Sequence, residues 1–274
     1  MSISKKIIKF FAEVLALLII GLIVVGLLYL IYFLTMSFGN KNTTDANIKI
    51  INDSMKESID NYNFNITTIK TNVKIVKSDS FNIDTNNRNI LIDYDSSNKS
   101  IIINEKKLSL FNYNESYDMT IYIPSTLFKE TSITTNSGNV VIDTLVTNVF
   151  NLNVGDGKTS IDNLTVYKSA NVSTGVGKVD INGALINNLY LSNGVGETKI
   201  KANVTGNSSI NSGAGNIYME VLQPNNYFTF KIDKAIGEIV IDGENVTSGT
   251  LNTGPSIINI ESGIGKIEIK CNNE

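Results

Sequence analysis

GVGKVDI, at residues 175–181, decides the fold because near-copies of this phrase recur along the chain. Each copy has a small turn residue, a glycine two positions later, and then two mostly hydrophobic residues separated by one position. The seven copies are NSGNVVI ending at Ile142, GDGKTSI at Ile161, GVGKVDI at Ile181, GVGETKI at Ile200, GAGNIYM at Met219, AIGEIVI at Ile241 and GIGKIEI at Ile269. The repeat array therefore covers residues 136–270.

The second glycines of these copies recur at regular intervals. They are Gly138, Gly157, Gly177, Gly196, Gly215, Gly237 and Gly265, spaced by 19, 20, 19, 19, 22 and 28 residues. A period near 20 is typical of a solenoid in which coils stack on one another. A corner repeated in every coil needs positive φ or close approach of two backbones, and glycine permits both. The sequence therefore predicts an all-β protein, a β-solenoid or β-helix of about seven coils of 19–28 residues.

Three apolar stretches recur in each coil and predict its inward-facing side chains. The first precedes the glycine, the second follows it, and a weaker third lies about seven residues beyond it. In that order they are Phe150/Leu152, Ala170/Val172, Leu189/Leu191 and Phe228/Phe230; Val140/Ile142, Val179/Ile181, Ile217/Met219, Ile239/Ile241 and Ile267/Ile269; and Leu145, Leu164, Ala184 and Leu222. If coils pair in register, Lys178 faces Glu197 and Asp180 faces Lys199. We interpret these opposite-charge pairs as exposed contacts that help to set the register of neighbouring coils.

Short strands are also predicted before the array. From Phe64 onward, segments with alternating or β-branched residues are bounded by Asn, Asp or Ser. They are NFNITTIK (63–70), VKIVKSD (73–79), FNID (81–84), NILIDYD (89–95), KSIIINE (99–105), KLSLFNY (107–113) and DMTIYIP (118–124). We interpret the aromatic residues Phe111, Tyr113 and Tyr117 as packing of a first cap or hairpin, with a binding surface as the alternative.

The N-terminal region contains an apolar run without charge from Val14 to Leu34. A helix of that length matches the hydrocarbon thickness of a bilayer. Three lysines, at positions 5, 6 and 9, precede the run, so the positive-inside rule predicts a single-pass cell-membrane protein with a cytoplasmic N-terminus. A cleaved signal peptide is the alternative, although the run is longer than an ordinary signal-peptide core. The predicted regions are 1–38, the cytoplasmic N-terminus and signal anchor; 39–63, a polar stalk with a short helix around Asp53–Tyr62; and 64–274, the extracellular β-solenoid domain.

Composition narrows the possible functions. The 274 residues carry a net charge of −3, and the part after residue 40 has 20 basic and 25 acidic residues, or −5. This balance argues against a nucleic-acid partner, which needs a basic stripe. The chain has no histidine and one cysteine, Cys271, so no intramolecular disulfide can form. We interpret Cys271 as a peripheral strand-end residue; an intermolecular disulfide or a reactive thiol is the alternative.

Two motifs that resemble ligand sites fail on inspection. GDGKTS, residues 155–160, is similar to a phosphate-binding loop, but position 152 is Leu where that motif needs Gly, and no helix is predicted after the lysine. Calcium-binding nonapeptide repeats need an Asp two residues after the second glycine, where this chain has Val, Thr or Ile. No cofactor or metal is therefore predicted.

A polysaccharide-active β-helix enzyme is the alternative function. Such chemistry needs clustered carboxylates together with a basic residue. Asp143, Asp162 and Asp180 are spaced by about one coil and are the candidates for such a cluster. The chain has a single arginine, Arg88, and no histidine for acid–base work. The sequence therefore favours a protein that is not an enzyme, and we assign no catalytic residue.

The stretch DMTIYIPSTLFKETSITTNSGNVVID, residues 118–143, places a strand before Pro124, a short link, and a strand leading into Ser-Gly-x-Val-x-Ile. Together with the glycine repeats that follow, it resembles the putative-adhesin, or "toast-rack", domain family of bacterial membrane-anchored cell-envelope proteins, over roughly residues 65–270. The resemblance implies a β-solenoid-like fold without demonstrated catalytic residues, and association with envelope stress-response systems. The two long last intervals, and the lack of a recognisable C-terminal cap, depart from a regular array.

We therefore expect a membrane-anchored, extracytoplasmic and non-catalytic β-solenoid that presents a rigid interaction surface, in envelope stress response or adhesion. The expected partners are the cell membrane, through the N-terminal helix, and an envelope protein, a wall polymer or further copies of the chain. The array stops five residues after Ile269, so the terminal coil is expected to leave an open strand edge. We expect that edge to be covered by another chain or by the 242–256 loop.

Overall fold

The structure is a computed structural model that describes residues 19, 21–31, 48, 50–53, 61–106, 116–125 and 127–273. The chain divides into two compact units, 1–46 and 47–274. In the first unit, residues 21–31 are helical. No helix among the residues described is both long and apolar enough to span a bilayer. Much of the predicted anchor, Val14–Leu34, and most of the predicted helix around Asp53–Tyr62 lie outside the described residues.

A short helical segment at residues 50–53 belongs to the second unit and packs against its β-structure. The side chain of Ile51 is fully buried in the core. Asn52 pairs with the backbone of Phe81, donating from Nδ2 to its carbonyl at 2.8 Å and accepting from its N–H at 2.7 Å. This part of the region predicted as a stalk is therefore part of the folded domain.

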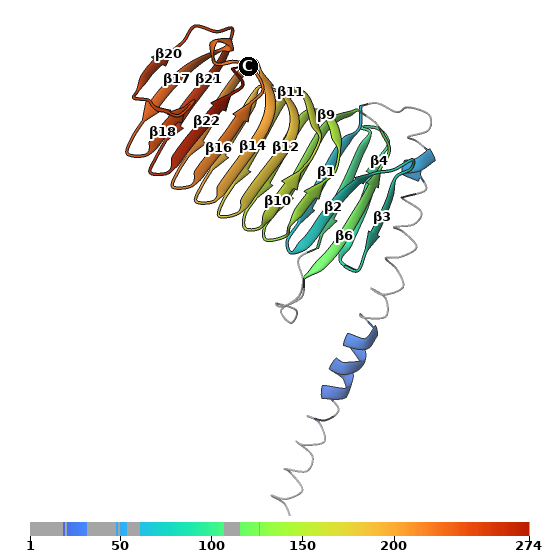
Figure 1. The fold of residues 1–274 in the computed structure, drawn as a ribbon. Coiled ribbons are helices and arrows are strands. Elements are labelled where there is room, and N and C mark those ends of the chain that lie inside the picture. The colour runs from blue at the N-terminus through green and yellow to red at the C-terminus, as the bar shows by residue number, and fades with distance from the viewer. Residues whose placement is uncertain are drawn as a thin grey trace, which may run out of the picture. The chain divides into compact units, whose positions relative to one another are not determined.

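The described residues of the second unit form β-strands, many of which are labelled in Figure 1, and a 3-10 helix. They are β1 (Asn63–Thr68), β2 (Thr71–Lys77), β3 (Asn82–Thr85), β4 (Ile90–Asp95), β5 (Ser100–Glu105), β6 (Tyr117–Ile123), β7 (Phe128–Thr135), β8 (Val140–Ile142), β9 (Leu145–Val154), β10 (Lys158–Ile161), β11 (Leu164–Thr174), β12 (Lys178–Asn187), β13 (Leu189–Asn193), β14 (Glu197–Thr205), β15 (Asn207–Ser212), β16 (Asn216–Val221), η1 (Asn225–Tyr227), β17 (Phe228–Lys234), β18 (Glu238–Ile241), β19 (Glu244–Asn245), β20 (Gly249–Leu251), β21 (Ser256–Ser262) and β22 (Lys266–Cys271). Six of the seven strands predicted before the array are confirmed. The seventh, 107–113, falls outside the described residues.

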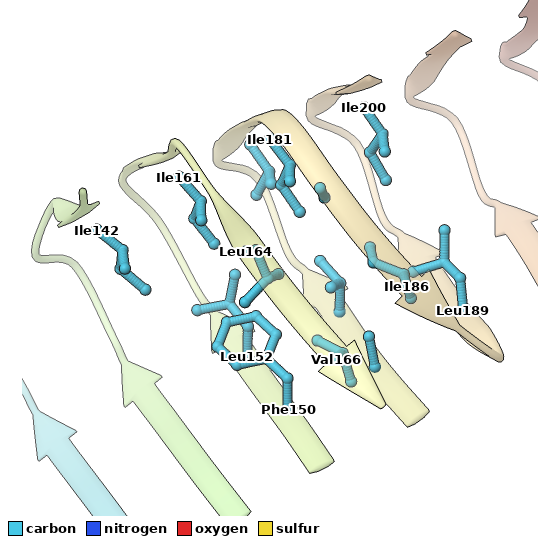
Figure 2. Close-up of a cluster of buried hydrophobic side chains, with 14 of the residues drawn as sticks. Ile142, Phe150, Leu152, Ile161, Leu164, Val166, Ile181, Ile186, Leu189 and Ile200 are labelled. Atoms are coloured by element: carbon cyan, nitrogen blue, oxygen red, sulfur yellow. The ribbon is translucent and has the colours of Figure 1, made fainter. Parts of the chain in front are cut away.

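The strands stack as the parallel rungs of a solenoid, as predicted. Ile142, Ile161 and Ile181 are register partners on consecutive rungs, and Ile181 is in turn the partner of Ile200. Figure 2 shows these isoleucines as a row of side chains pointing into the interior. We call the face built by the strands after the glycines the post-glycine face, and the face built by the strands before them the pre-glycine face. A shorter third face pairs segments of β9, β11, β12 and β14.

The glycine corners are explained by close approach between rungs. A Cβ placed on Gly196 would lie 1.7 Å from the carbonyl oxygen of Gly177, and one on Gly265 would lie 1.8 Å from that of Gly215. No real Cβ contact is that short, so any side chain would force two rungs apart. Among the second glycines of the repeat, only Gly157 has positive φ. Glycine is therefore required at these corners mainly because neighbouring rungs approach so closely, and less because of its backbone conformation.

The core predicted from the three apolar stretches is confirmed with one exception. The paired residues on the pre-glycine and post-glycine faces are buried, as are Leu145, Leu164 and Ala184 on the third face. Leu222 was predicted to be buried and is 43% exposed, because Val221 takes the inward position as the register partner of Ala202. Gln223 then ends the third face with its side-chain amide, which bonds to both the N–H and the carbonyl of Val204.

The order of the rungs departs from the sequence order at the C-terminal end. β21 and β22 pair with β15 and β16 on one side and with β17 and β18 on the other. The last coil of the chain is therefore the second rung from the end, and the prediction that each coil pairs with the next is wrong here. The 28-residue interval between Gly237 and Gly265 supplies the additional chain that this return requires.

The order of the rungs also departs from the sequence order at the N-terminal end. β1 and β2, the first strands of the domain, lie between β5 and β6 on one side and β7 and β8 on the other. Strands predicted only to precede the array are thus rungs of it, although they lack the glycine corner. Among the described residues, nine parallel rungs follow one another on the post-glycine face, in the order β6, β2, β8, β10, β12, β14, β16, β22 and β18.

Short antiparallel strands cover both ends of the solenoid. At the N-terminal end β3 pairs with β6, and β4 pairs with β5. At the C-terminal end β19 pairs with β18, and β20 pairs with β17. β19 and β20 lie in the 242–256 loop, so the expectation that this loop covers an edge is confirmed. The edge that it covers belongs to β17 and β18, and not to the last coil as predicted.

Candidate interaction surface

The three aspartates considered for catalysis do not form one row. Asp143 and Asp162 directly follow register partners, Ile142 and Ile161, and so lie on adjacent rungs at one corner. Asp180 instead lies on a strand, with Ser160 and Lys199 as its register partners. Among the residues that the structure describes, no group of three acidic, histidine or cysteine side chains is placed to hold a metal ion. The three aspartates considered for the enzymatic alternative are therefore not aligned in one row.

Two shallow hollows lie on the part of the solenoid surface that the structure describes. One hollow of about 250 Å³ lies beside Ile123 and Pro124, and another of about 260 Å³ lies around Lys199 and Tyr218. Pockets for small ligands usually occupy roughly 300–1,000 Å³ and enclose most of the ligand. Both hollows are smaller and open, so neither has the shape of a small-molecule site.

Most of the charged residues that are register partners on neighbouring rungs lie on the post-glycine face. Lys178 and Glu197 are register partners, as predicted, and their charged atoms are 2.7 Å apart. Asp180 and Lys199 are also register partners, but Lys199 Nζ lies 3.2 Å from Glu197 Oε1 on its own strand. The hydrogen bond from Lys178 lowers the pKa of Glu197, and that same bond raises the pKa of Lys178. Both side chains are well exposed, so the pair supports register more than stability.

Two rows of outward positions on the pre-glycine face, in line with Ser132 and Thr134, carry no charged residue from β7 to β15. We call this surface the neutral face, defined by Ser132, Thr134, Asn151, Asn153, Asn171, Ser173, Tyr190, Ser192, Ser209 and Asn211. Its members stack as register partners from rung to rung. Charged residues border the neutral face at both ends, with Glu130 on β7 and with Glu261 and Lys231 on β21 and β17.

The amides of the neutral face are held in a ladder. Asn171 donates from Nδ2 to Asn151 Oδ1 at 2.7 Å, and Asn151 donates to Glu130 Oε1 at 2.8 Å. Tyr190 is the next rung after Asn171, and its ring is 46% exposed. An exposed aromatic ring beside ordered amides and hydroxyls offers an apolar surface and hydrogen-bonding groups side by side. This face was not predicted from the sequence, although Asn and Ser alternate with buried residues in 150–154 and 170–174.

A second row that the sequence analysis missed lies inside the glycine corner. The residue just before the turn is polar and buried on most rungs: Thr68, Thr135, Thr174, Asn193, Ser212 and Ser262. Ser212 donates to the Gly215 carbonyl at 2.6 Å, and Asn193 donates to the Gly196 carbonyl at 2.9 Å. These side chains bridge each turn from within. We interpret them as folding residues, although the buried hydroxyl of Thr68 has no hydrogen-bond partner.

Cys271 is buried at the end of β22, in agreement with the prediction of a strand-end residue. Its backbone N–H donates to Asp242 Oδ1 at 2.7 Å. Burial, together with the nearby Asp242 carboxylate, raises the pKa of the Cys271 thiol to about 12. Only the thiolate is a strong nucleophile, so this cysteine is not a reactive site in the folded protein.

Comparison with known protein families identifies the family of this chain. The model of the Toastrack DUF4097 family matches residues 41–233. The chain belongs to the Toastrack DUF4097 family. The match confirms the resemblance inferred from residues 118–143 and the glycine repeats. The Toastrack match ends within β17, so β18 to β22 lie beyond it.

Two solved structures are similar to this Toastrack chain. One is described as a putative cell adhesion protein from Clostridium sporogenes ATCC 15579, with 16% identity over 77% of this chain and 93% of that one, and a TM-score of 0.37. The other is described as a putative adhesin from Bacteroides fragilis NCTC 9343, with 15% identity over 76% and 92% and a TM-score of 0.46. At these values they carry no argument about function. A comparison with curated proteins finds no match.

Proposed function

We propose that this chain is a single-pass membrane protein whose extracytoplasmic solenoid is a non-catalytic adhesion module. The proposed ligand is an uncharged segment of a wall polysaccharide, bound along the neutral face. The observation that carries this proposal is the two rows of amides and hydroxyls with Tyr190 among them, which contain no charged residue from β7 to β15 and are bordered by Glu130. A polymer of neutral sugars presents complementary hydroxyls and apolar ring faces at repeated positions.

Membrane attachment belongs to the same proposal. Its support is the uncharged run Val14–Leu34 with lysines before it. Within that run the side chains of Leu22, Ile23 and Leu28 are each more than half exposed. Protease added to intact cells tests this part: the solenoid is degraded or shed if it is outside, and is protected until lysis if it is inside.

Sedimentation of the full-length chain with purified wall polysaccharide tests ligand binding. We expect Tyr190→Ala to weaken binding about tenfold or more, equivalent to about 1.4 kcal/mol. Asn171→Asp should weaken binding as well, because it places a charge in the amide ladder. Lys199→Ala, on the post-glycine face, is the matched control and should bind as the unmodified chain does. Equal loss with Lys199→Ala, or no loss with Tyr190→Ala, would reject the neutral face as the binding surface.

A further inference from the structure

An apolar row runs along the outside of the glycine corners. We call it the ridge, and it consists of Val176, Val195, Ala214, Ile264 and Ile236, the middle residues of successive turns. The four larger side chains are 65%, 63%, 69% and 83% exposed in that order. These are among the most exposed hydrophobic residues of the solenoid, and they occupy consecutive rungs.

Hydrogen bonds between turns hold the ridge in one line. Val195 N–H donates to the Gly175 carbonyl, and Ala214 N–H donates to the Gly194 carbonyl, both at 2.8 Å. Ile264 N–H bonds to Gly213 at 2.8 Å, and Ile236 N–H bonds to Gly263 at 3.1 Å. The flanking residues are glycines, apart from Ala235 beside Ile236, and cover little of these side chains, so the ridge protrudes. A contiguous exposed apolar stripe of this kind marks an interaction site.

The ridge begins abruptly. The turns before it carry Ser137 and Asp156 at the same position, although their rungs are otherwise alike. Its last two members, Ile264 and Ile236, lie beyond the family match, which ends at residue 233. The turn geometry therefore accepts a polar middle residue, and the five apolar ones are a feature of the C-terminal half of this chain.

The charges beside the ridge identify the partner. Two residues after each ridge residue, the post-glycine face carries Lys178, Glu197, Asn216, Lys266 and Glu238, in spatial order. Read in reverse, this row is Glu, Lys, Asn, Glu, Lys. Placed antiparallel against itself, it sets every lysine opposite a glutamate and Asn216 opposite Asn216. Few surfaces are complementary to their own reverse, and that property is what a two-fold symmetric contact requires.

We infer that the ridge binds the ridge of a second copy of the same chain, antiparallel, about a two-fold axis that passes near Ala214. Val176 then meets Ile236 of the second copy, and Val195 meets its Ile264. A parallel arrangement would instead bring Glu238 toward the opposite flank, where Asp233 occupies the same rung. The axis is perpendicular to the rods, so the two solenoids begin at the same height along it, which suits attachment of both copies to one membrane.

The two surfaces have separate roles, and the inference goes beyond the proposed adhesion because it uses a different edge of the solenoid. The neutral face stays uncovered, so a dimer carries two of them. Two linked binding faces raise the avidity for a repeating polymer without any new contact. The ridge is small for a stable interface in solution, but confinement to one membrane raises the effective concentration of the copies.

Cross-linking of the full-length chain in liposomes tests the geometry. Cys271→Ala provides the background, and Ala214→Cys, Val176→Cys and Ile236→Cys are introduced singly and treated with a short bismaleimide. We expect Ala214→Cys to link to itself, Val176→Cys and Ile236→Cys to link only when the two variants are mixed, and neither to link alone. Self-linking of Val176→Cys as strong as that of Ala214→Cys would show a parallel contact, and absence of any link would reject the dimer.

Charge reversal provides a second test that does not depend on introduced cysteines. Lys178→Glu should weaken dimerisation about tenfold, because it opposes Glu238 of the second copy. Adding Glu238→Lys to the same chain should restore it, with thermal unfolding as the check that both variants fold. A double variant no better than the single one would overturn the pairing. If Val195→Asp abolishes binding to protein-free liposomes while no dimer is detected, the ridge binds lipid and the inference is wrong. Polysaccharide sedimentation with the same variants reports on adhesion separately.

Discussion

The middle of the solenoid and its two ends are stabilised in different ways. In the middle, rung follows rung at a nearly constant interval, and glycine is required because each corner nearly touches the one below, as at Gly196 and Gly177. At the ends the repeat stops, and individual polar side chains form the hydrogen bonds that a further rung would otherwise supply. The difference teaches that a repeating sequence specifies how rungs stack, whereas non-repeating residues specify where stacking stops.

The N-terminal end is closed by a buried carboxylate. Glu105 is 6% exposed, and its Oε2 accepts from the N–H groups of Ile69, Lys70 and Thr71 at 2.6, 3.1 and 3.2 Å. Asn87 donates to the other carboxylate oxygen and to Thr71 Oγ1. In the middle rungs such corner N–H groups bond to carbonyls of the neighbouring turn. The Glu105 carboxylate takes the place of those carbonyls.

The C-terminal end is closed by a more open network. A tight turn with positive φ at Asp242 and Gly243 folds β19 back onto β18. The Asp242 carboxylate accepts from Asn225 Nδ2, from the Cys271 N–H and from Asn273 Nδ2. Partial burial alone would raise the pKa of Asp242, but these hydrogen bonds outweigh it and hold the pKa below its ordinary value.

The largest expected effect comes from removing the last coil. A chain that ends at Pro255 lacks β21 and β22, so β17 and β18 lose their parallel neighbours. We expect loss of cooperative unfolding in urea, followed by circular dichroism. The control is the deletion of one middle rung, residues 178–196, which removes the same length of chain. This deletion joins Gly177 to Glu197 and keeps the register of the remaining rungs. A truncated chain as stable as the control would contradict the distinction between middle and ends.

Glycine at the corner is the next test. Gly196→Ala should destabilise the solenoid by about 3 kcal/mol, because overpacking against a backbone carbonyl cannot relax by rotamer change. Ala214→Val, in the neighbouring turn, adds more volume at a position directed to solvent and should leave the free energy of unfolding unchanged. Urea unfolding of both variants measures the contrast. Similar losses in the two would show that turn conformation, not rung spacing, requires glycine.

Removal of the Glu105 carboxylate at the N-terminal end should have the next largest effect on stability. Glu105→Ala leaves three backbone N–H groups and Asn87 without their acceptor, and should cost about 3 kcal/mol. Glu105→Gln keeps an acceptor for the backbone but directs an N–H₂ group at Asn87, so it should cost less. Chemical denaturation at pH 7 gives both values. If alanine is tolerated as well as glutamine, the corner is satisfied in some other way.

Asp242 should have a smaller effect that depends on pH. Asp242→Ala should cost about 1 kcal/mol at pH 7, since the half-buried network can exchange a lost bond for water. Because the folded pKa of Asp242 is lowered, its contribution is complete above the unfolded pKa of about 3.9 and is lost as pH falls through the folded value. The difference between the unmodified chain and Asp242→Asn should therefore shrink below pH 4. A constant difference from pH 7 to pH 3 would be inconsistent with this origin.

The smallest effect is expected on the post-glycine face. Lys178→Ala removes one partner of an exposed ion pair, and such pairs contribute little to folding. The urea midpoint should not change measurably, with or without added salt. A clear loss of stability would mean that the charged ladder contributes to stability as well as to register.

The sequence determined the middle of this fold far better than its ends. The period of the glycines predicted the stacking, the register of Lys178 with Glu197 and the buried rows, because every rung repeats the same local requirement. It could not predict that β1 and the last coil are each one rung in from the end, since parallel stacking is equally satisfied in either order. The Asp242-Gly243 pair was a readable hairpin signal. The role of Glu105 depends on contacts across 34 to 36 residues and had no local signal.

The candidate surfaces were only partly visible in the sequence. The neutral face and the ridge both follow from residues at fixed positions of the repeat, so their members could be listed before the fold was known. What was missing was spatial order, because Ile264 lies between Ala214 and Ile236 only after the last coil has taken its inner place. The alternating charges beside the ridge form a self-complementary row in that order alone.

The inward placement of both terminal coils constrains how such proteins change length in evolution. A coil duplicated at either terminus would have to displace a cap and would lose the strand that shields it. A unit of 19 or 20 residues gained or lost between β8 and β16 leaves both caps untouched. Longer and shorter descendants of this gene should therefore differ by internal units, while their first and last coils remain the same.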